Sequence, residues 1–278
     1  MDSLTTLALF IAAWFVVYGV LKLTKIDRPD LEIQPLYILF KSTRLNNLIS
    51  RLAALNPKFW RVIGNIGVVS SIGQASFATW LLTNNLLRFI FKPEQATPVQ
   101  PLIPGVTISI SSLPWFMLAA GVVILTHELS HGIQCVLEGV KVKSSAIMLA
   151  VITFGGAVEP DEEELTKSSI MSRMRIFAAG SIVNLITGLL IIIIMTSFRG
   201  LMPDFLGLFL SWLYFISINL AMMNMLPIGP LDGGQMWRTF TDTLPRGKQI
   251  QTIATYAFIV LILGNIVFSL NMFGLVPI

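Results

Sequence analysis

The heptapeptide THELSHG at residues 126–132 is the stretch around which the chain is best understood. It holds both histidines of the 278-residue chain, His127 and His131, with Glu128 directly after the first. Residues four apart lie on one face of an α-helix, so both imidazoles can reach one metal ion about 2.0–2.1 Å away. Glu128 projects roughly 100° around the helix and can take a proton from water that the metal acidifies. The heptapeptide therefore predicts a hydrolytic metal site.

The composition around this heptapeptide is that of a membrane protein. Hydrophobic residues make up 54% of the chain and charged residues 12%, with a mean hydropathy of +0.77, whereas soluble domains carry about 25% charged residues. Ionisable groups at membrane depth cost about 3 kcal/mol each and usually mark function. The basic residues lie in short loops between apolar runs, where they indicate orientation in the membrane and not a nucleic-acid partner.

Six uncharged apolar runs are long enough to cross a hydrocarbon core of about 30 Å as helices. They are residues 3–21, 62–87, 115 to about 137, 176–198, 205 to about 226 and 250 to about 270. The loop charges place residues 22–61, 141–175 and 238–248 on the cytoplasmic side, with both termini outside. The prediction is an all-α polytopic membrane protein with about six transmembrane helices, forming one domain over residues 1–278, with the heptapeptide nearer the cytoplasmic face.

Shorter segments between these runs predict further structure. Residues 144–158 are too few for a spanning helix and contain TFGGA, which is poor helix material, so a re-entrant, β-hairpin-like segment is expected. The acidic run at 159–164 is interpreted as a solvated loop that leads into a helix. Residues 31–40 alternate weakly and predict a short strand, and residues 45–55 predict a helix at the membrane surface.

A catalytic zinc site needs a third protein ligand and one open position. Cys135, the single cysteine, lies one turn beyond His131, but one straight helix would struggle to surround an ion with three ligands, so Cys135 is interpreted as a small buried residue. Asp232 follows an uncharged run, within the proline- and glycine-rich stretch 224–234. Such a break is tolerated at membrane depth inside protein or beside water. Asp232 is therefore the candidate third ligand, with an ordinary helix stop capped by aspartate as the alternative.

These elements together resemble the site-2 proteases, a family of intramembrane zinc metalloproteases that cut transmembrane segments of their substrates. Residues 127–131 match the family's H-E-x-x-H, residues 224–233 its N-x-x-P-x(4)-D-G, and residues 179–184 are similar to its G-x-x-x-N/S/G. The resemblance is specific over about 115–237, the expected catalytic core. It implies that His127, His131 and Asp232 hold one catalytic Zn²⁺ ion and that Glu128 is the catalytic acid/base.

The resemblance also implies how a substrate is held. Asn184 is expected to bind the substrate backbone or the oxyanion, the alternative being a small polar contact between helices beside Gly180. Gly155 and Gly156 are expected to offer a strand edge to an unwound substrate by β-augmentation. The expected partners are a transmembrane protein substrate and the lipid bilayer, with no nucleic acid; the oligomeric state stays open. The chain has no room for a PDZ insertion and looks like the short form common in archaea, which implies a prokaryotic cell membrane.

Other functions compete with regulated intramembrane proteolysis. Membrane zinc proteases that trim prenylated substrates also use H-E-x-x-H, but their expected third ligand is a glutamate far downstream, and no glutamate follows Glu164. A zinc-binding membrane transporter or a catalytically inactive membrane chaperone on the same fold is the alternative from another class. Transporters line a path with several ligand groups, whereas here the ionisable groups cluster, and Glu128 argues against an inactive enzyme.

Overall fold

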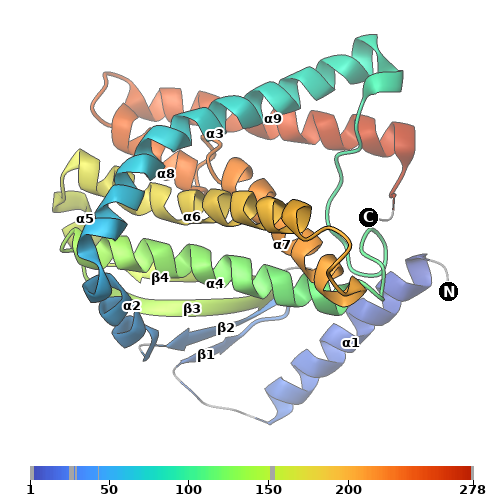
Figure 1. Cartoon of the computed structure of the whole chain (residues 1–278), viewed down its shortest axis with the longest axis horizontal. Coiled ribbons are helices and arrows are strands. Elements are labelled where there is room, and N and C mark those ends of the chain that lie inside the picture. The colour runs from blue at the N-terminus through green and yellow to red at the C-terminus, as the bar shows by residue number, and fades with distance from the viewer. Residues whose placement is uncertain (1–2, 25–27, 29, 43, 151–153, 277–278) are drawn as a thin grey trace.

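Long apolar helices form the bulk of the molecule, as the uncharged runs predict (Figure 1). The computed structural model describes residues 3–24, 28, 30–42, 44–150 and 154–276. Within these residues, five helices are long and apolar enough to cross a membrane. They are α3 (Pro57–Phe91), α4 (Leu113–Leu137), α6 (Ile170–Ser197), α7 (Asp204–Met223) and α9 (Gly247–Phe273). The predicted fold class, a helical polytopic membrane protein with a small hairpin segment, is confirmed.

The first predicted span, residues 3–21, coincides with α1 (Ser3–Leu23), which stands at one edge of the molecule (Figure 1). Within α1, the apolar segment whose side chains the structure describes throughout is Ile11–Leu23. This segment is shorter than a helix that spans a membrane. Trp14 is buried, and its indole N–H donates to the carbonyl oxygen of Pro35 at 2.8 Å. This bond fastens α1 to the turn before the second strand.

A four-stranded antiparallel sheet lies along α4, in the order β1-β2-β3-β4 (Figure 1). The predicted hairpin is β3 (Val142–Ala150) with β4 (Phe154–Pro160), and the residues between them lie outside the described part of the chain. The strand predicted at 31–40 is instead two short strands, β1 (Leu31–Ile33) and β2 (Tyr37–Ser42), because the chain turns at Pro35. β2 pairs with β3, for example Phe40 opposite Ile147, which leaves β4 as an edge strand.

Two short helices flank the sheet as the sequence predicts. α2 (Arg44–Leu55) buries Ile49 against Gly132 of α4, where an added Cβ would lie 2.7 Å from Ile49 Cδ1. α5 (Glu162–Lys167) begins in the acidic run, and the Asp161 carboxylate accepts the backbone N–H groups of Glu163 and Glu164. The Glu164 bond, assisted by Lys143, holds the pKa of Asp161 below its usual value.

Helix α6 is the centre of the bundle because small residues let its neighbours approach closely. Half of its most apolar window is buried inside the protein. Gly180 faces α4 and Gly188 faces Ile218 of α7, and a Cβ at either position would overlap the neighbouring side chains. Small residues are the usual means of close helix contact in membranes.

The stretch after α7 is broken and folds back before α8 (Asp232–Thr241) begins. The backbone N–H of Gly233 donates to the Asn224 carbonyl at 2.7 Å and closes this turn. A Cβ on Gly233 would overlap the Met225 backbone, and one on Gly234 the Ile228 carbonyl. Glycine is therefore required at both positions for Asp232 to face α4.

Candidate metal centre

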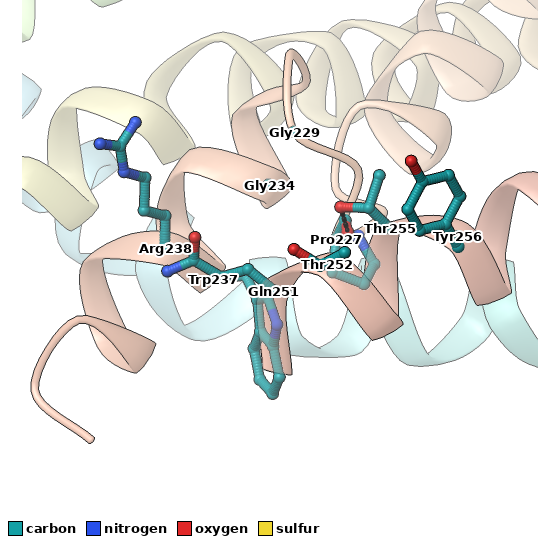
Figure 2. A pocket seen from close by; sticks show the side chains of 9 residues that line it. All are labelled: Pro227, Gly229, Gly234, Trp237, Arg238, Gln251, Thr252, Thr255 and Tyr256. Carbon is teal, nitrogen blue, oxygen red and sulfur yellow. Dashed lines mark hydrogen bonds between the residues drawn. The ribbon is translucent and has the colours of Figure 1, made fainter. Parts of the chain in front are cut away.

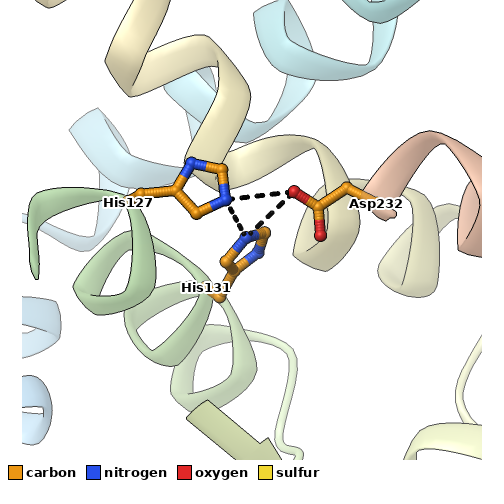
Figure 3. Close-up of side chains that lie close together, drawn as sticks. All are labelled: His127, His131 and Asp232. Carbon is orange, nitrogen blue, oxygen red and sulfur yellow. Dashed lines mark hydrogen bonds and ion pairs between the residues drawn. The ribbon is translucent and has the colours of Figure 1, made fainter. Parts of the chain in front are cut away.

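Three side chains from two separate helices meet at one point (Figure 3). Nε2 of His127 lies 3.1 Å from Oδ2 of Asp232, and Nε2 of His131 lies 3.3 Å from the same oxygen. The two Nε2 atoms are 3.1 Å apart. Four ligands about 2.0–2.1 Å from a tetrahedral ion are separated by about 3.3–3.4 Å, so this triangle is close to the size that zinc needs. The structure thus brings together the three predicted ligand residues.

The ring orientation of His131 is set by a backbone group. Its Nδ1 lies 2.7 Å from the carbonyl oxygen of Ile176 on α6. Because a carbonyl oxygen only accepts hydrogen bonds, Nδ1 carries the proton and Nε2 presents a lone pair toward Asp232. This is the arrangement in which a histidine binds a metal and is held by a second partner.

His127 is held in the same way by a side chain of α6. Nδ2 of Asn184 lies 2.9 Å from Nδ1 of His127. Oδ1 of Asn184 is buried and has no hydrogen-bond partner among the described residues. A half-turn of the amide places Oδ1 against Nδ1, where it accepts the ring N–H and leaves the lone pair of Nε2 for a metal. Asn184 is fully buried and contacts the Nδ1 side of the His127 ring, opposite the Nε2 atom that faces Asp232.

Gly180 lies directly against both imidazole rings. An added Cβ at this position would be 2.5 Å from His127 Cε1 and 2.5 Å from His131 Nε2. No side chain fits there without moving a ligand, so the glycine determines how closely α6 approaches the histidines.

Asn224 contacts the ligand atoms themselves, a role that the sequence reasoning missed. Its Nδ2 lies 3.1 Å from His127 Nε2 and donates to Asp232 Oδ2 at 3.2 Å. The available signal was its place eight residues before Asp232 in the N-x-x-P-x(4)-D-G match. The amide orients the carboxylate toward the two rings.

Glu128 faces the hairpin. Its Oε2 accepts the backbone N–H of Val158 at 2.9 Å. The N–H group of Val158 therefore points away from β3. A Cβ on Gly156 would lie 2.6 Å from Glu128 Cγ, so the glycine makes room for the carboxylate stem. Gly155 is the next residue of β4 and pairs with Met148 of β3. The open edge of β4 therefore lies beside the predicted catalytic carboxylate.

Cys135 is buried among apolar residues that include Val140 and Ile176. The prediction that it is a small buried residue is confirmed. The donor set at this centre is two imidazoles and one carboxylate, the set of catalytic zinc sites with one open position.

Comparisons with known proteins cover this same region. The family model described as Peptidase family M50 matches residues 115–206 and 201–265. A membrane-bound transcription factor site-2 protease homolog of Arabidopsis thaliana is 25% identical over 52% of this chain and 28% of its own length. An uncharacterised protein of Methanocaldococcus jannaschii is 27% identical over 66% of this chain and 48% of its own. The chain thus spans about a quarter to a half of the length of these relatives.

Proposed function

The chain belongs to peptidase family M50, the site-2 protease family, and on this premise we propose that it is an intramembrane zinc metalloprotease. Its reaction is hydrolysis of peptide bonds within transmembrane segments of membrane proteins, as in regulated intramembrane proteolysis. The observation that carries the proposal is the triangle of His127, His131 and Asp232, with the lone pairs of both rings directed inward.

His127, His131 and Asp232 would hold the zinc ion. Zinc in such a site supplies Lewis acidity, which polarises the scissile carbonyl and lowers the pKa of a water. Glu128 accepts the proton of that water and later delivers it to the leaving amine. Asn184 and the Ile176 carbonyl keep the two rings in the required tautomer.

The substrate is a transmembrane helix that unwinds locally, because its own hydrogen bonds occupy the scissile carbonyl. Unwinding exposes backbone groups that need new partners in the membrane. The open edge of β4, with Gly155 and Gly156, offers such partners by β-augmentation. This edge delivers the peptide beside Glu128, and the cut lies nearer the cytoplasmic end of the substrate helix.

The test is cleavage of a transmembrane substrate by purified protein, measured together with bound zinc. Glu128→Gln should retain zinc and lose cleavage by about 10²–10⁴-fold, the usual contribution of general acid–base catalysis. Asp232→Asn should lose both zinc and cleavage. Glu163→Gln, at an exposed position of α5, is the matched control and should change neither.

The same measurement separates the competing functions. Full cleavage by Glu128→Gln would refute the role of Glu128, and cleavage that resists zinc chelation would refute the metal mechanism. A wild-type protein that binds zinc but cuts no transmembrane substrate would favour a zinc-binding transporter or an inactive chaperone on this fold.

A further inference from the structure

Two adjoining hollows lie between α3, α8 and α9. The larger measures about 830 Å³ and is mainly apolar, with Ile72, Met236 and Phe258 in its wall. The smaller measures about 320 Å³, lies against α8 and α9, and has polar as well as apolar walls, with Arg238 and Gln251 among the polar residues (Figure 2). Pro227 and Trp237 line both hollows. The two spaces therefore form one site with a polar end and an apolar end.

The smaller hollow begins nearer the start of α9 than the larger one, and the two overlap along this helix. On α9 the lining of the smaller hollow runs from Gln251 to Tyr256 and that of the larger from Ala254 to Phe258. On α3 the larger hollow extends from Val68 to Thr83, about 22 Å of helix. Half of a hydrocarbon core is about 15 Å thick. The larger hollow is therefore long enough for a whole acyl chain of one leaflet, and the smaller hollow adds polar groups beside it.

The mainly apolar wall of the larger hollow favours an acyl chain as its occupant. A hydrocarbon chain carries no polar group that such a wall would leave without a hydrogen-bond partner.

Arg238 lines the smaller hollow, and the segment that begins with it is basic. Residues 238–248 carry three basic side chains, Arg238, Arg246 and Lys248, against the single acidic Asp242. The Arg238 side chain is 65% exposed, and its ion pair with Asp242 is long, at 3.7 Å. The Trp237 Nε1–H is buried without a partner among the described residues. Basic clusters at the end of a membrane helix attract anionic lipid head groups.

We propose that this site binds one phospholipid with an anionic head group, its phosphate at Arg238 and one acyl chain in the larger hollow. Tyr256 and Trp237 at the polar end are residue types that favour the membrane interface. The wall of the larger hollow includes Met225 and Gly233. The bound lipid thus contacts the segment that carries Asp232. The proposal does not depend on proteolysis, and lipid retention is its main test.

The head-group test uses the full chain in nanodiscs of phosphatidylcholine with a minor fraction of phosphatidylglycerol. Native mass spectrometry after extraction measures which lipid stays bound. We expect one retained phosphatidylglycerol per chain. Arg238→Gln should lower the preference for phosphatidylglycerol about fivefold, the effect of one basic residue near a membrane surface. Arg199→Gln changes another exposed arginine, which follows α6; it is the control and should retain the preference.

The acyl-chain test fills the larger hollow from α9. Ala254→Phe should abolish retention of either lipid, because Ala254 lines that hollow. Ala257→Phe, on an exposed face of α9 outside the lining, should retain lipid as the wild type does. Unchanged retention in Arg238→Gln or in Ala254→Phe would overturn the proposal. If Ala254→Phe instead left lipid retention intact and lowered cleavage, the occupant would be a substrate helix, which also overturns it.

Discussion

Helices α6 and α9 have nearly the same length and hydropathy but opposite surroundings. Half of the most apolar window of α6 is buried within the protein, whereas the corresponding share of α9 is 11%. α6 presents Gly180 and Asn184 to the histidines, while α9 exposes Ile253, Val260 and Val267. Apolarity thus identifies a membrane helix, and small and polar residues on one face decide whether that helix lies at the centre or at the edge.

The largest effect should come from a methyl group at the centre of the bundle. Gly180→Ala would place a carbon 2.5 Å from both histidine rings and displace a ligand. A misplacement of about 1 Å costs about 10²-fold in rate, and zinc occupancy should fall in parallel. Gly264→Ala on α9 is the matched control, because its Cβ would meet Leu86 at an ordinary 3.5 Å. Metal analysis and cleavage assays distinguish the two. If Gly180→Ala retained zinc, α6 would be able to move away from the histidines, and the close packing at Gly180 would not be required for the site.

The next effect concerns the role of Asn184. Asn184→Ala removes the partner of His127 Nδ1, and the loss of such a partner usually weakens metal affinity about 10–100-fold. Competition with a fluorescent zinc chelator measures this affinity. Asn184→Asp, which keeps an acceptor at the same position, should restore most of it. Unchanged zinc affinity with impaired cleavage would instead support the oxyanion or substrate role predicted from sequence.

A smaller effect is expected where α9 is fastened to α3. Asn265 is fully buried, accepts the Asn85 amide at 3.1 Å and donates to the Leu82 carbonyl at 3.0 Å. Asn265→Leu should cost about 1 kcal/mol, or about 2–4 °C in the thermal midpoint. Its zinc affinity should stay unchanged because α9 contributes no ligand. Asn219→Leu is the control, because the Asn219 amide donates to the Phe215 carbonyl of its own helix, and this variant should melt like the wild type. Loss of zinc in Asn265→Leu would show that the packing of α9 at the edge of the bundle affects the metal centre beside α6.

The smallest effect lies outside the membrane, at the start of α5. The pKa of Asp161 is depressed in the folded protein, chiefly by the Glu164 N–H. Its stabilising contribution is therefore complete above the usual aspartate pKa and is lost as the pH falls through the lower, folded value. Amide hydrogen exchange at Glu163 and Glu164 should accelerate, relative to the intrinsic rate, as Asp161 is protonated. Asp161→Asn should remove this pH dependence, and an unchanged profile would contradict the cap.

The sequence was sufficient for features that depend on local spacing. The two histidines share a helical face because they are four residues apart, and Asp232 was marked by the break in an apolar run. The hairpin was indicated by glycines in a run too short to span. Each of these signals lies within about fifteen residues, where backbone geometry alone relates the positions.

Other features depend on contacts between distant parts of the chain. The pairing of β2 with β3 joins residues more than one hundred positions apart, such as Phe40 and Ile147. The contact of Gly180 with both rings depends on the packing of α6 against α4. The orientation of the Asn224 amide toward His127 depends on the turn that the Gly233 N–H closes. No periodicity in the sequence encodes these distances, which follow from how the helices pack.

The hydrogen bond from Val158 to Glu128 connects the hairpin to the proposed acid/base. One amide on the unpaired edge of β4 donates to the carboxylate itself. A peptide that pairs with this amide must take it from Glu128, and a force that shifts β4 reaches the carboxylate through a single bond. In the proposed β-augmentation, docking at the strand and release of the carboxylate are therefore one exchange, and the carboxylate is freed when a substrate backbone lies beside it.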